Sequence, residues 1–127
     1  IAEAFGGSEL VLKADESGPV NLALKVPGLQ RPLSVNELSD GQLRFLFLSA
    51  ALLAPRPPTV MILNEPETSL HPDLLPALAE LIAAASSTTQ IVVTTHASGL
   101  ADRLLGGPDI AAYALEIVNG ETRVLAR

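Results

Sequence analysis

Two short, uninterrupted apolar runs constrain the fold of this chain more than any other feature of its sequence. They are TVMIL at Thr59–Leu63 and QIVVT at Gln90–Thr94. Continuous apolar runs of this length are typical of strands that are buried on both faces, as in a parallel sheet. Between them, the Leu- and Ala-rich segment Asp73–Ala85 has the length of a helix, and Pro72 suits its first turn. We therefore expect a crossover unit in which the two strands are adjacent and parallel.

Further elements flank this unit on both sides. From Ser39 to Leu53, apolar residues cover nearly every side of a helix, which is typical of a helix in the centre of a fold. A short helix is expected at Ser98–Leu105. Alternating apolar residues predict an antiparallel hairpin at each end of the chain, formed by Ser8–Asp15 with Val20–Val26, and by Ile110–Val118 with Glu121–Ala126 around the turn Asn119-Gly120. The fold class is therefore α/β, with parallel core strands, flanking helices and antiparallel hairpins at both ends.

Composition limits the domain organisation and the classes of partner. A chain of 127 residues that is 48% hydrophobic fits a single domain, residues 1–127, with a packed core. Cysteine is absent, which excludes disulfides and thiolate metal sites. No apolar run reaches the ~20 residues that span a bilayer, so we expect no membrane partner and a cytoplasmic location. The formal net charge of −6 lacks the basic footprint of a nucleic-acid-binding domain.

A first candidate cluster precedes the helix that starts near Ser39. Ser39 can cap this helix, and Gly41 lets the backbone come close to a ligand. The N-terminus of a helix also offers free N–H groups to an anion such as phosphate. A plain N-cap explains the same residue types, so both interpretations stay open.

Polar residues also follow the two buried strands. Asn64, Glu65 and Glu67 come after VMIL, and His96 comes after QIVV. Because ligands gather at the carboxyl ends of parallel strands, we expect Glu65 and His96 at the same edge of the sheet. A carboxylate held there can orient a water molecule or bind a metal. The alternatives are a polar strand exit for Glu65 and a structural or surface position for His96.

Four segments in register resemble the motifs of ABC-type ATPases. LSDGQ is similar to the signature motif, VMILNEPE to a Walker B strand with its catalytic glutamate, TSLHP to the D-loop region, and TTH to the switch-histidine segment. The resemblance covers Val35 to Asp102 and is closest to the RecF-, SMC- and OLD-like branch of predicted AAA ATPases. ABC transporters tend to show DEPTSALD, which this chain lacks. The resemblance implies the C-terminal lobe of a P-loop NTPase-like fold.

The resemblance also implies roles in a dimer that holds ATP between two subunits. Glu65 would polarise the attacking water, and His96 would sense or bind the γ-phosphate. The residues that would contact ATP held by the partner subunit are Ser39, Asp40, Gly41 and Gln42. The residues that would lie at the dimer interface beside the sites are Ser69, Leu70 and His71.

Asn64 departs from the family's motif. It occupies the position of the aspartate that holds Mg²⁺ through water, and an amide oxygen lacks the negative charge that a hard cation prefers. Weakened Mg²⁺ binding or slower hydrolysis is one interpretation, and a benign family variation is the other.

The sequence also lacks the phosphate-binding motif GxxxxGK[ST]. Its two lysines, Lys13 and Lys25, do not follow a glycine-rich loop. We therefore expect the C-terminal lobe of a longer ATPase, a fragment that binds ATP weakly or not at all when isolated. The leading prediction is Mg-dependent ATP hydrolysis by a homodimer of the full-length protein, in the DNA-repair, chromosome-maintenance or defence-related branch. DNA would be reached only through other regions. The alternatives are a nucleotide-gated switch with little turnover because of Asn64, a transporter ATPase subunit, and a packing module with no activity of its own.

Overall fold

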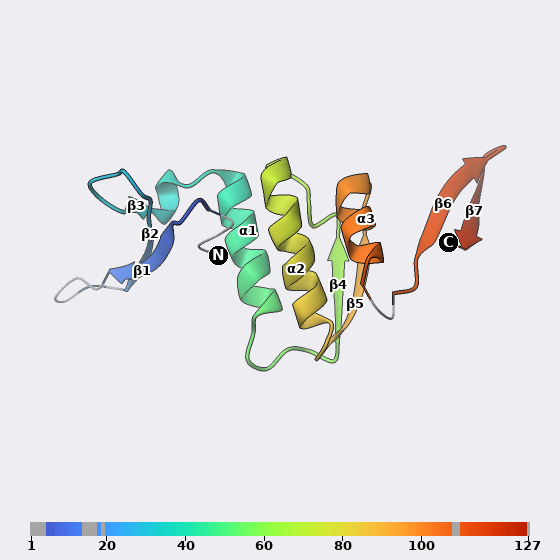
Figure 1. Ribbon diagram of the computed structural model, residues 1–127, viewed down its shortest axis with the longest axis horizontal. Helices are drawn as coiled ribbons and strands as arrows, with labels where there is room; N and C mark the ends of the chain where they lie inside the picture. The colour runs from blue at the N-terminus through green and yellow to red at the C-terminus, as the bar shows by residue number, and fades with distance from the viewer. Residues whose placement is uncertain (1–4, 14–17, 19, 108–109, 127) are drawn as a thin grey trace.

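The computed structural model describes residues 5–13, 18, 20–107 and 110–126. These residues form three α-helices and three small sheets. Along the long axis of the molecule, the N-terminal sheet comes first, followed by α1, α2, the parallel strands with α3, and the C-terminal hairpin (Figure 1). The described residues include no helix that is long and apolar enough to cross a membrane.

The central crossover unit is confirmed. Strands β4 (Val60–Asn64) and β5 (Gln90–Thr94) are parallel neighbours and pair in register along their whole length. The helix between them, α2, spans Leu75–Ala85, because a short 3-10 turn at Pro72–Leu74 precedes it. The observed helix therefore starts at Leu75, two residues after the expected start at Asp73. Helix α3 spans Ser98–Leu105, as predicted.

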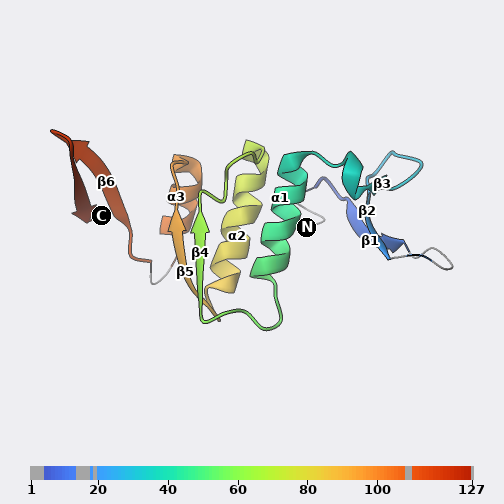
Figure 2. The ribbon, with the colours of Figure 1, turned by 180° about the vertical axis from the view of Figure 1, so that it is seen from behind.

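The prediction that both faces of these strands are buried is wrong for the part of the chain that the structure describes. Met61 and Leu63 of β4 pack with the helices, whereas Ile62 between them is 71% exposed. Val92 of β5 is exposed on the same side as Ile62. Seen from behind, β4 and β5 lie in front of the helices (Figure 2). The helices thus cover one face of the pair, and no described residues cover the other.

Helix α1 (Asp40–Leu52) contributes to two hydrophobic cores. Phe45 lies in the larger core, which also contains residues of β4, α2 and α3. The next residue, Leu46, lies in a smaller core with Leu24 and Leu38. The Phe5 ring packs edge-on against Phe45, with ring centroids 5.3 Å apart.

The prediction that α1 is enclosed on nearly every side is also wrong. Phe47 is 70% exposed, because the two cores occupy two sides of the helix and no described element packs against the side that carries Phe47. The helix also ends at Leu52, three residues before Pro55.

Antiparallel hairpins are present near both ends, as predicted. Strands β1 (Glu9–Lys13) and β2 (Asn21–Lys25) pair with each other, and a short strand, β3 (Leu33–Ser34), adds to β2. The expected continuation of the first strand to Asp15 lies outside the described residues. Strands β6 (Tyr113–Val118) and β7 (Glu121–Ala126) form the second hairpin.

The turn of the second hairpin has the backbone that its sequence predicts. Asn119 and Gly120 have φ angles of 52° and 82°. Two consecutive positive φ values are typical of the two-residue hairpin turn, for which Asn-Gly is the preferred sequence.

Candidate functional site at the carboxyl ends of the parallel strands

Glu65 and His96 meet at the carboxyl ends of β4 and β5, as their positions after the two strands predict. The Oε1 atom of Glu65 and the Nε2 atom of His96 are 3.4 Å apart. Both side chains remain accessible, since 43% of the Glu65 side chain and 91% of the His96 side chain are exposed. The structure therefore presents a carboxylate and an imidazole together at the sheet edge, where a ligand can reach both.

The backbone of Glu65 adopts a conformation that non-glycine residues rarely have, with φ at 44°. Its N–H donates to the carbonyl of Thr94 on the neighbouring strand, at 2.8 Å. Its carbonyl accepts from Nη2 of Arg44 on α1, at 2.9 Å, and from the N–H of Thr68, at 3.1 Å. Strain of this kind persists only where surrounding contacts enforce it, and it is concentrated at functional sites.

The side chain of Asn64 points to the neighbouring strand. Its Oδ1 atom accepts a hydrogen bond from the Thr94 hydroxyl, at 2.6 Å. The described residues contain no group of three or more His, Cys, Asp or Glu side chains that could hold a metal ion. Mg²⁺ at this edge would therefore take most of its ligands from water and from a substrate's phosphates, as this ion commonly does.

Glu67 is part of the site in a way that the sequence analysis did not foresee. Its Oε1 atom accepts from the Thr95 hydroxyl at 2.6 Å, from the His96 N–H at 3.1 Å and from the Ala97 N–H at 3.3 Å. Burial raises the pKa of this carboxyl, but hydrogen bonding to Thr95 and to the backbone of Glu67, His96 and Ala97 outweighs burial, so the pKa is lowered from its usual value. The only signal in the sequence was a second acid close to the end of a buried strand.

The start of α1 is capped by its own side chains. The Ser39 hydroxyl accepts from the Gln42 N–H at 3.3 Å, and Oε1 of Gln42 accepts from the Ser39 N–H at 2.9 Å. This reciprocal pair is a capping box, so the simpler of the two interpretations of Ser39 describes the local structure. Ser39 and Asp40 are nevertheless exposed at the helix N-terminus.

Gly41 allows a close approach within the chain. A Cβ atom at Gly41 would collide with the carbonyl oxygen of Ser69, in the segment that follows β4. Ser69 itself has a positive φ of 66°. From the sequence, we expect Gly41 to let the backbone come close to a ligand. In the structure, the missing side chain lets α1 come close to the backbone at Ser69.

The segment predicted to contact the partner's nucleotide and the segment predicted to lie at the dimer interface are neighbours. Residues 39–42 and 69–72 line one open recess of about 540 Å³. Within it, Nδ1 of His71 accepts from the N–H of Asp73 at 3.3 Å and caps the turn that leads into α2. The structure therefore brings the start of α1 together with Ser69, Leu70 and His71, although they are far apart in the sequence.

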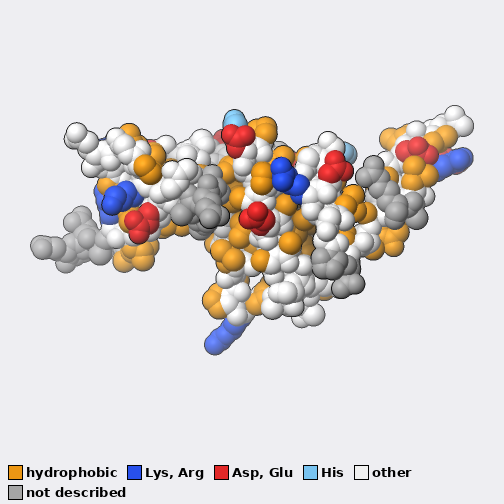
Figure 3. Space-filling model, viewed as in Figure 1, with side chains coloured by type: hydrophobic (Ala, Val, Ile, Leu, Met, Phe, Trp, Pro, Cys, Tyr) orange, Lys and Arg blue, Asp and Glu red, His pale blue; other side chains and the backbone are white. Residues whose placement is uncertain are grey.

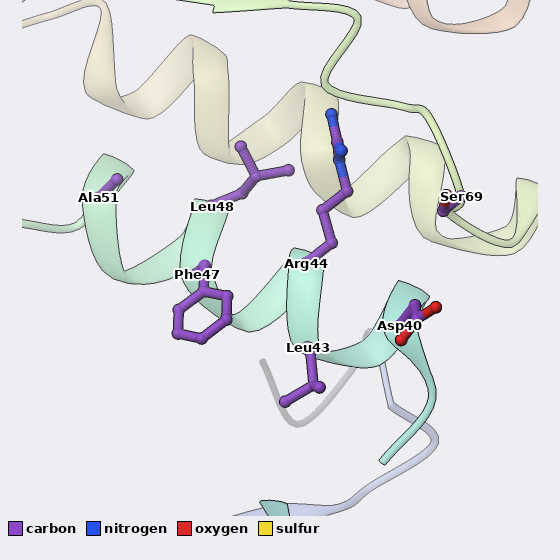
Figure 4. Close-up of a pocket in the computed structure, with 7 residues that line it drawn as sticks. All are labelled: Asp40, Leu43, Arg44, Phe47, Leu48, Ala51 and Ser69. Carbon is purple, nitrogen blue, oxygen red and sulfur yellow. The ribbon is translucent and has the colours of Figure 1, made fainter. Parts of the chain in front are cut away.

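A second recess, of about 420 Å³, runs along the exposed side of α1. Arg44 extends from α1 toward the segment after β4, whereas Leu43 and Phe47 point away from that segment (Figure 4). On the face shown in Figure 3, the basic side chains lie apart from one another among acidic and hydrophobic ones. This distribution agrees with the acidic net charge and offers no basic stripe on that face.

Comparison with protein families gives one match. Residues 3–102 match the family model described as "AAA domain, putative AbiEii toxin, Type IV TA system". The matched range contains α1, both parallel strands and all of the candidate site residues. The search of curated proteins gave no significant match.

Solved structures with a similar fold include several heads of SMC proteins. A structure from work on ATP-driven dimerization and DNA-stimulated activation of SMC ATPases has a TM-score of 0.76 at 18% identity, over 99% of this chain and 77% of the other. An SmcHead bound to the C-winged helix domain of ScpA has a TM-score of 0.71 at 18% identity, over 99% of this chain and 39% of the other.

The SMC head domain from Thermotoga maritima has a TM-score of 0.66 at 20% identity, over 99% of this chain and 43% of the other. The chain thus spans less than half the length of two of these three structures. At such identities the likeness shows the fold, which is the α/β fold of SMC ATPase heads, similar to that of P-loop NTPases.

Proposed function

The chain belongs to the AAA domain family, and from this we propose that it is part of an ATPase in which Glu65 and His96 act at the γ-phosphate of ATP. The observation that carries the proposal is the pair itself, with Oε1 of Glu65 and Nε2 of His96 3.4 Å apart. The backbone of Glu65 has a positive φ, and both its N–H and its carbonyl are hydrogen-bonded. Glu65 would orient and polarise the attacking water, and His96 would contact the γ-phosphate. Both side chains are accessible enough for these roles.

The local contacts of Glu65 suit a residue that orients water. Its Oε2 atom accepts from the Thr68 hydroxyl at 3.3 Å, while Oε1 faces His96. Its backbone is hydrogen-bonded to Arg44 and Thr94, and these bonds fix the point from which the side chain extends. A positioned carboxylate of this kind is what general-base catalysis requires.

The remaining candidate residues fit a nucleotide sandwiched between two copies of the protein. The exposed start of α1, with Ser39, Asp40, Gly41 and Gln42, would contact ATP held by the partner subunit. The neighbouring segment Ser69–His71 would lie at the dimer interface, and the shared recess supports this arrangement. The loop that cradles the phosphates would come from a part of the protein beyond this sequence. DNA, if it is a partner, would bind through other regions.

Asn64 would hold Mg²⁺ only through water, and weakly. Its amide oxygen is neutral and already accepts from Thr94. The described residues contain no cluster of His, Cys, Asp or Glu side chains that forms a metal site by itself.

The same observation favours a second candidate function, a nucleotide-gated switch that closes on ATP with little turnover. Replacing Asn64 with Asp in the full-length protein separates the two functions. An increase in hydrolysis of about tenfold or more, which corresponds to about 1.4 kcal/mol of added transition-state stabilisation, would favour the switch. An unchanged rate would favour the active ATPase.

The direct test of the proposed function is Glu65→Gln in the full-length protein. Glutamine keeps the shape of the side chain but is a poor base, so single-turnover hydrolysis should fall by ~10²–10⁴. ATP-dependent dimerisation, measured by light scattering, should persist. Glu80→Gln on the exposed side of α2 is the matched control and should keep the wild-type rate. Wild-type hydrolysis by Glu65→Gln would remove Glu65 from the proposed mechanism.

A further inference from the structure

We propose that Glu67 is a positioning residue that fixes the loop carrying His96. Its consequence for catalysis rests on the function proposed above, whereas its effect on the loop does not. One carboxylate oxygen, Oε1, accepts hydrogen bonds from three consecutive residues, the Thr95 hydroxyl and the N–H groups of His96 and Ala97. Glu67 thereby ties the segment after β4 to the segment after β5.

These hydrogen bonds also hold the backbone that leads into α3. The N-cap residue of α3 is Ala97, which has no side chain able to accept from the first N–H groups of the helix. Glu67 accepts from the N–H of Ala97 and from that of the preceding residue, His96, and the Ala97 N–H also donates to the Thr95 hydroxyl, at 3.0 Å. A carboxylate at a helix N-terminus is also favoured by the helix dipole. The position of the loop before α3 therefore depends on a side chain from another part of the sheet edge.

The backbone contact is what determines where His96 lies. The His96 side chain is 91% exposed, so packing does not hold the imidazole in place. Its own N–H is held by Glu67, and its Nε2 lies 3.4 Å from Glu65. Glu65 and Glu67 are separated only by Pro66, which is fully buried. The segment Glu65–Glu67 thus presents one carboxylate to the imidazole and uses the other to hold the backbone of the same histidine.

Only one of the two Glu67 carboxylate oxygens accepts hydrogen bonds from the loop, and this allows variants that keep or remove that acceptor. Oε2 is buried and has no hydrogen-bond partner among the described residues. Glutamine can keep an oxygen at the Oε1 position and place its amide nitrogen at the Oε2 position, where no hydrogen bond is lost. Glutamine should therefore preserve the loop, whereas alanine removes the acceptor for all three donors.

The test uses the full-length protein and two readouts. Glu67→Ala should lower the single-turnover rate at saturating ATP by up to about 100-fold, the loss that a displacement of about 1 Å can cause. Glu67→Gln should stay close to the wild-type rate, as should the surface control Glu80→Ala. Because Glu67 acts through His96, adding Glu67→Ala to His96→Ala should cause no further loss. Losses that multiply in the double variant would overturn the proposal.

The second readout is independent of ATP hydrolysis. In the ¹⁵N–¹H spectrum, the amide resonances of His96 and Ala97 should move upfield in Glu67→Ala and little in Glu67→Gln. Glu67→Met, which keeps the length of the side chain but removes the acceptor, gives the same test if Glu67→Ala does not fold. If His96→Ala hydrolyses ATP at the wild-type rate, the proposed role of His96 fails, and the amide resonances alone decide whether Glu67 fixes the loop. Unchanged resonances in Glu67→Ala or Glu67→Met would overturn it.

Discussion

Replacing Gly41 with alanine would reveal how tightly α1 approaches the segment after β4. The added Cβ atom would collide with the carbonyl oxygen of Ser69 and lie 3.5 Å from its carbonyl carbon. These are backbone atoms of a residue whose positive φ already limits its freedom, so they cannot turn away as a flexible side chain would. Either α1 or the loop must shift.

The free-energy cost of this collision can be measured by comparing Gly41→Ala with the same substitution at a second helical glycine, Gly99. Gly99 is the second residue of α3, as Gly41 is of α1, but its Cβ would meet only Leu75 Cδ1, at 3.9 Å, an ordinary contact. Alanine is favoured over glycine in helices by up to about 1 kcal/mol, and this gain applies to both sites. The difference between the two variants is therefore the overpacking cost at Gly41, about 1–3 kcal/mol.

Urea denaturation followed by circular dichroism measures both free energies of unfolding. We expect Gly99→Ala to be neutral or stabilising, and Gly41→Ala to be less stable than Gly99→Ala by about 1–3 kcal/mol with an unchanged m-value. Equal changes in the two variants would refute the close approach of α1 to Ser69. The close approach of the Gly41 backbone to a ligand would then remain as the interpretation of this glycine.

Two further predictions concern an exposed ion pair and the larger core. The Arg31 guanidinium, 2.7 Å from Glu37, and the Ser34 contacts lower the pKa of Glu37 to about 2, so Arg31→Ala should raise that pKa toward the usual glutamate range in a carboxyl NMR titration. A lowered pKa means that the contribution of Glu37 to stability is present above its usual pKa and is lost as pH falls toward 2, and the variant should lose much of this pH dependence. Phe45 is fully buried, so Phe45→Ala should lower the free energy of unfolding, measured by urea denaturation, by about 3–5 kcal/mol. Phe47 is exposed, so Phe47→Ala should change it by no more than about 0.5 kcal/mol. Similar losses of stability in the two variants would contradict the described core.

The features that the sequence predicted correctly depend on local chemistry. Two short apolar runs and the helical segment between them suffice for a parallel pair, because crossover geometry leaves few other solutions. Asn119-Gly120 specifies its hairpin turn through the φ angles that these residues tolerate. The meeting of Glu65 and His96 then follows, since Glu65 is the first residue after β4 and His96 is the second after β5, and the two strands are parallel neighbours.

The features that the sequence did not predict depend on contacts between distant segments. Whether Ile62 or Phe47 is buried depends on which other elements pack against its strand or helix. The apolar residue type alone does not indicate whether such an element is present. The partner of Gly41 is a carbonyl oxygen 28 positions later, which no spacing rule anticipates. Glu67 and Glu65 are equally acidic and two positions apart, and only the folded backbone shows that one faces His96 and the other holds its N–H.

The position of α1 between the two cores has a consequence for how the molecule opens. Phe45 and Leu46 are consecutive residues, yet each belongs to a different core. Neither core can come apart without freeing one side of the same helix, so the amide protons of both cores should exchange with solvent in a single cooperative event. The described side chains of β6 and β7 belong to neither core, and the amides of this hairpin should exchange in a separate event of lower free energy. The start of α1, with Ser39, would then report on the integrity of both cores at once.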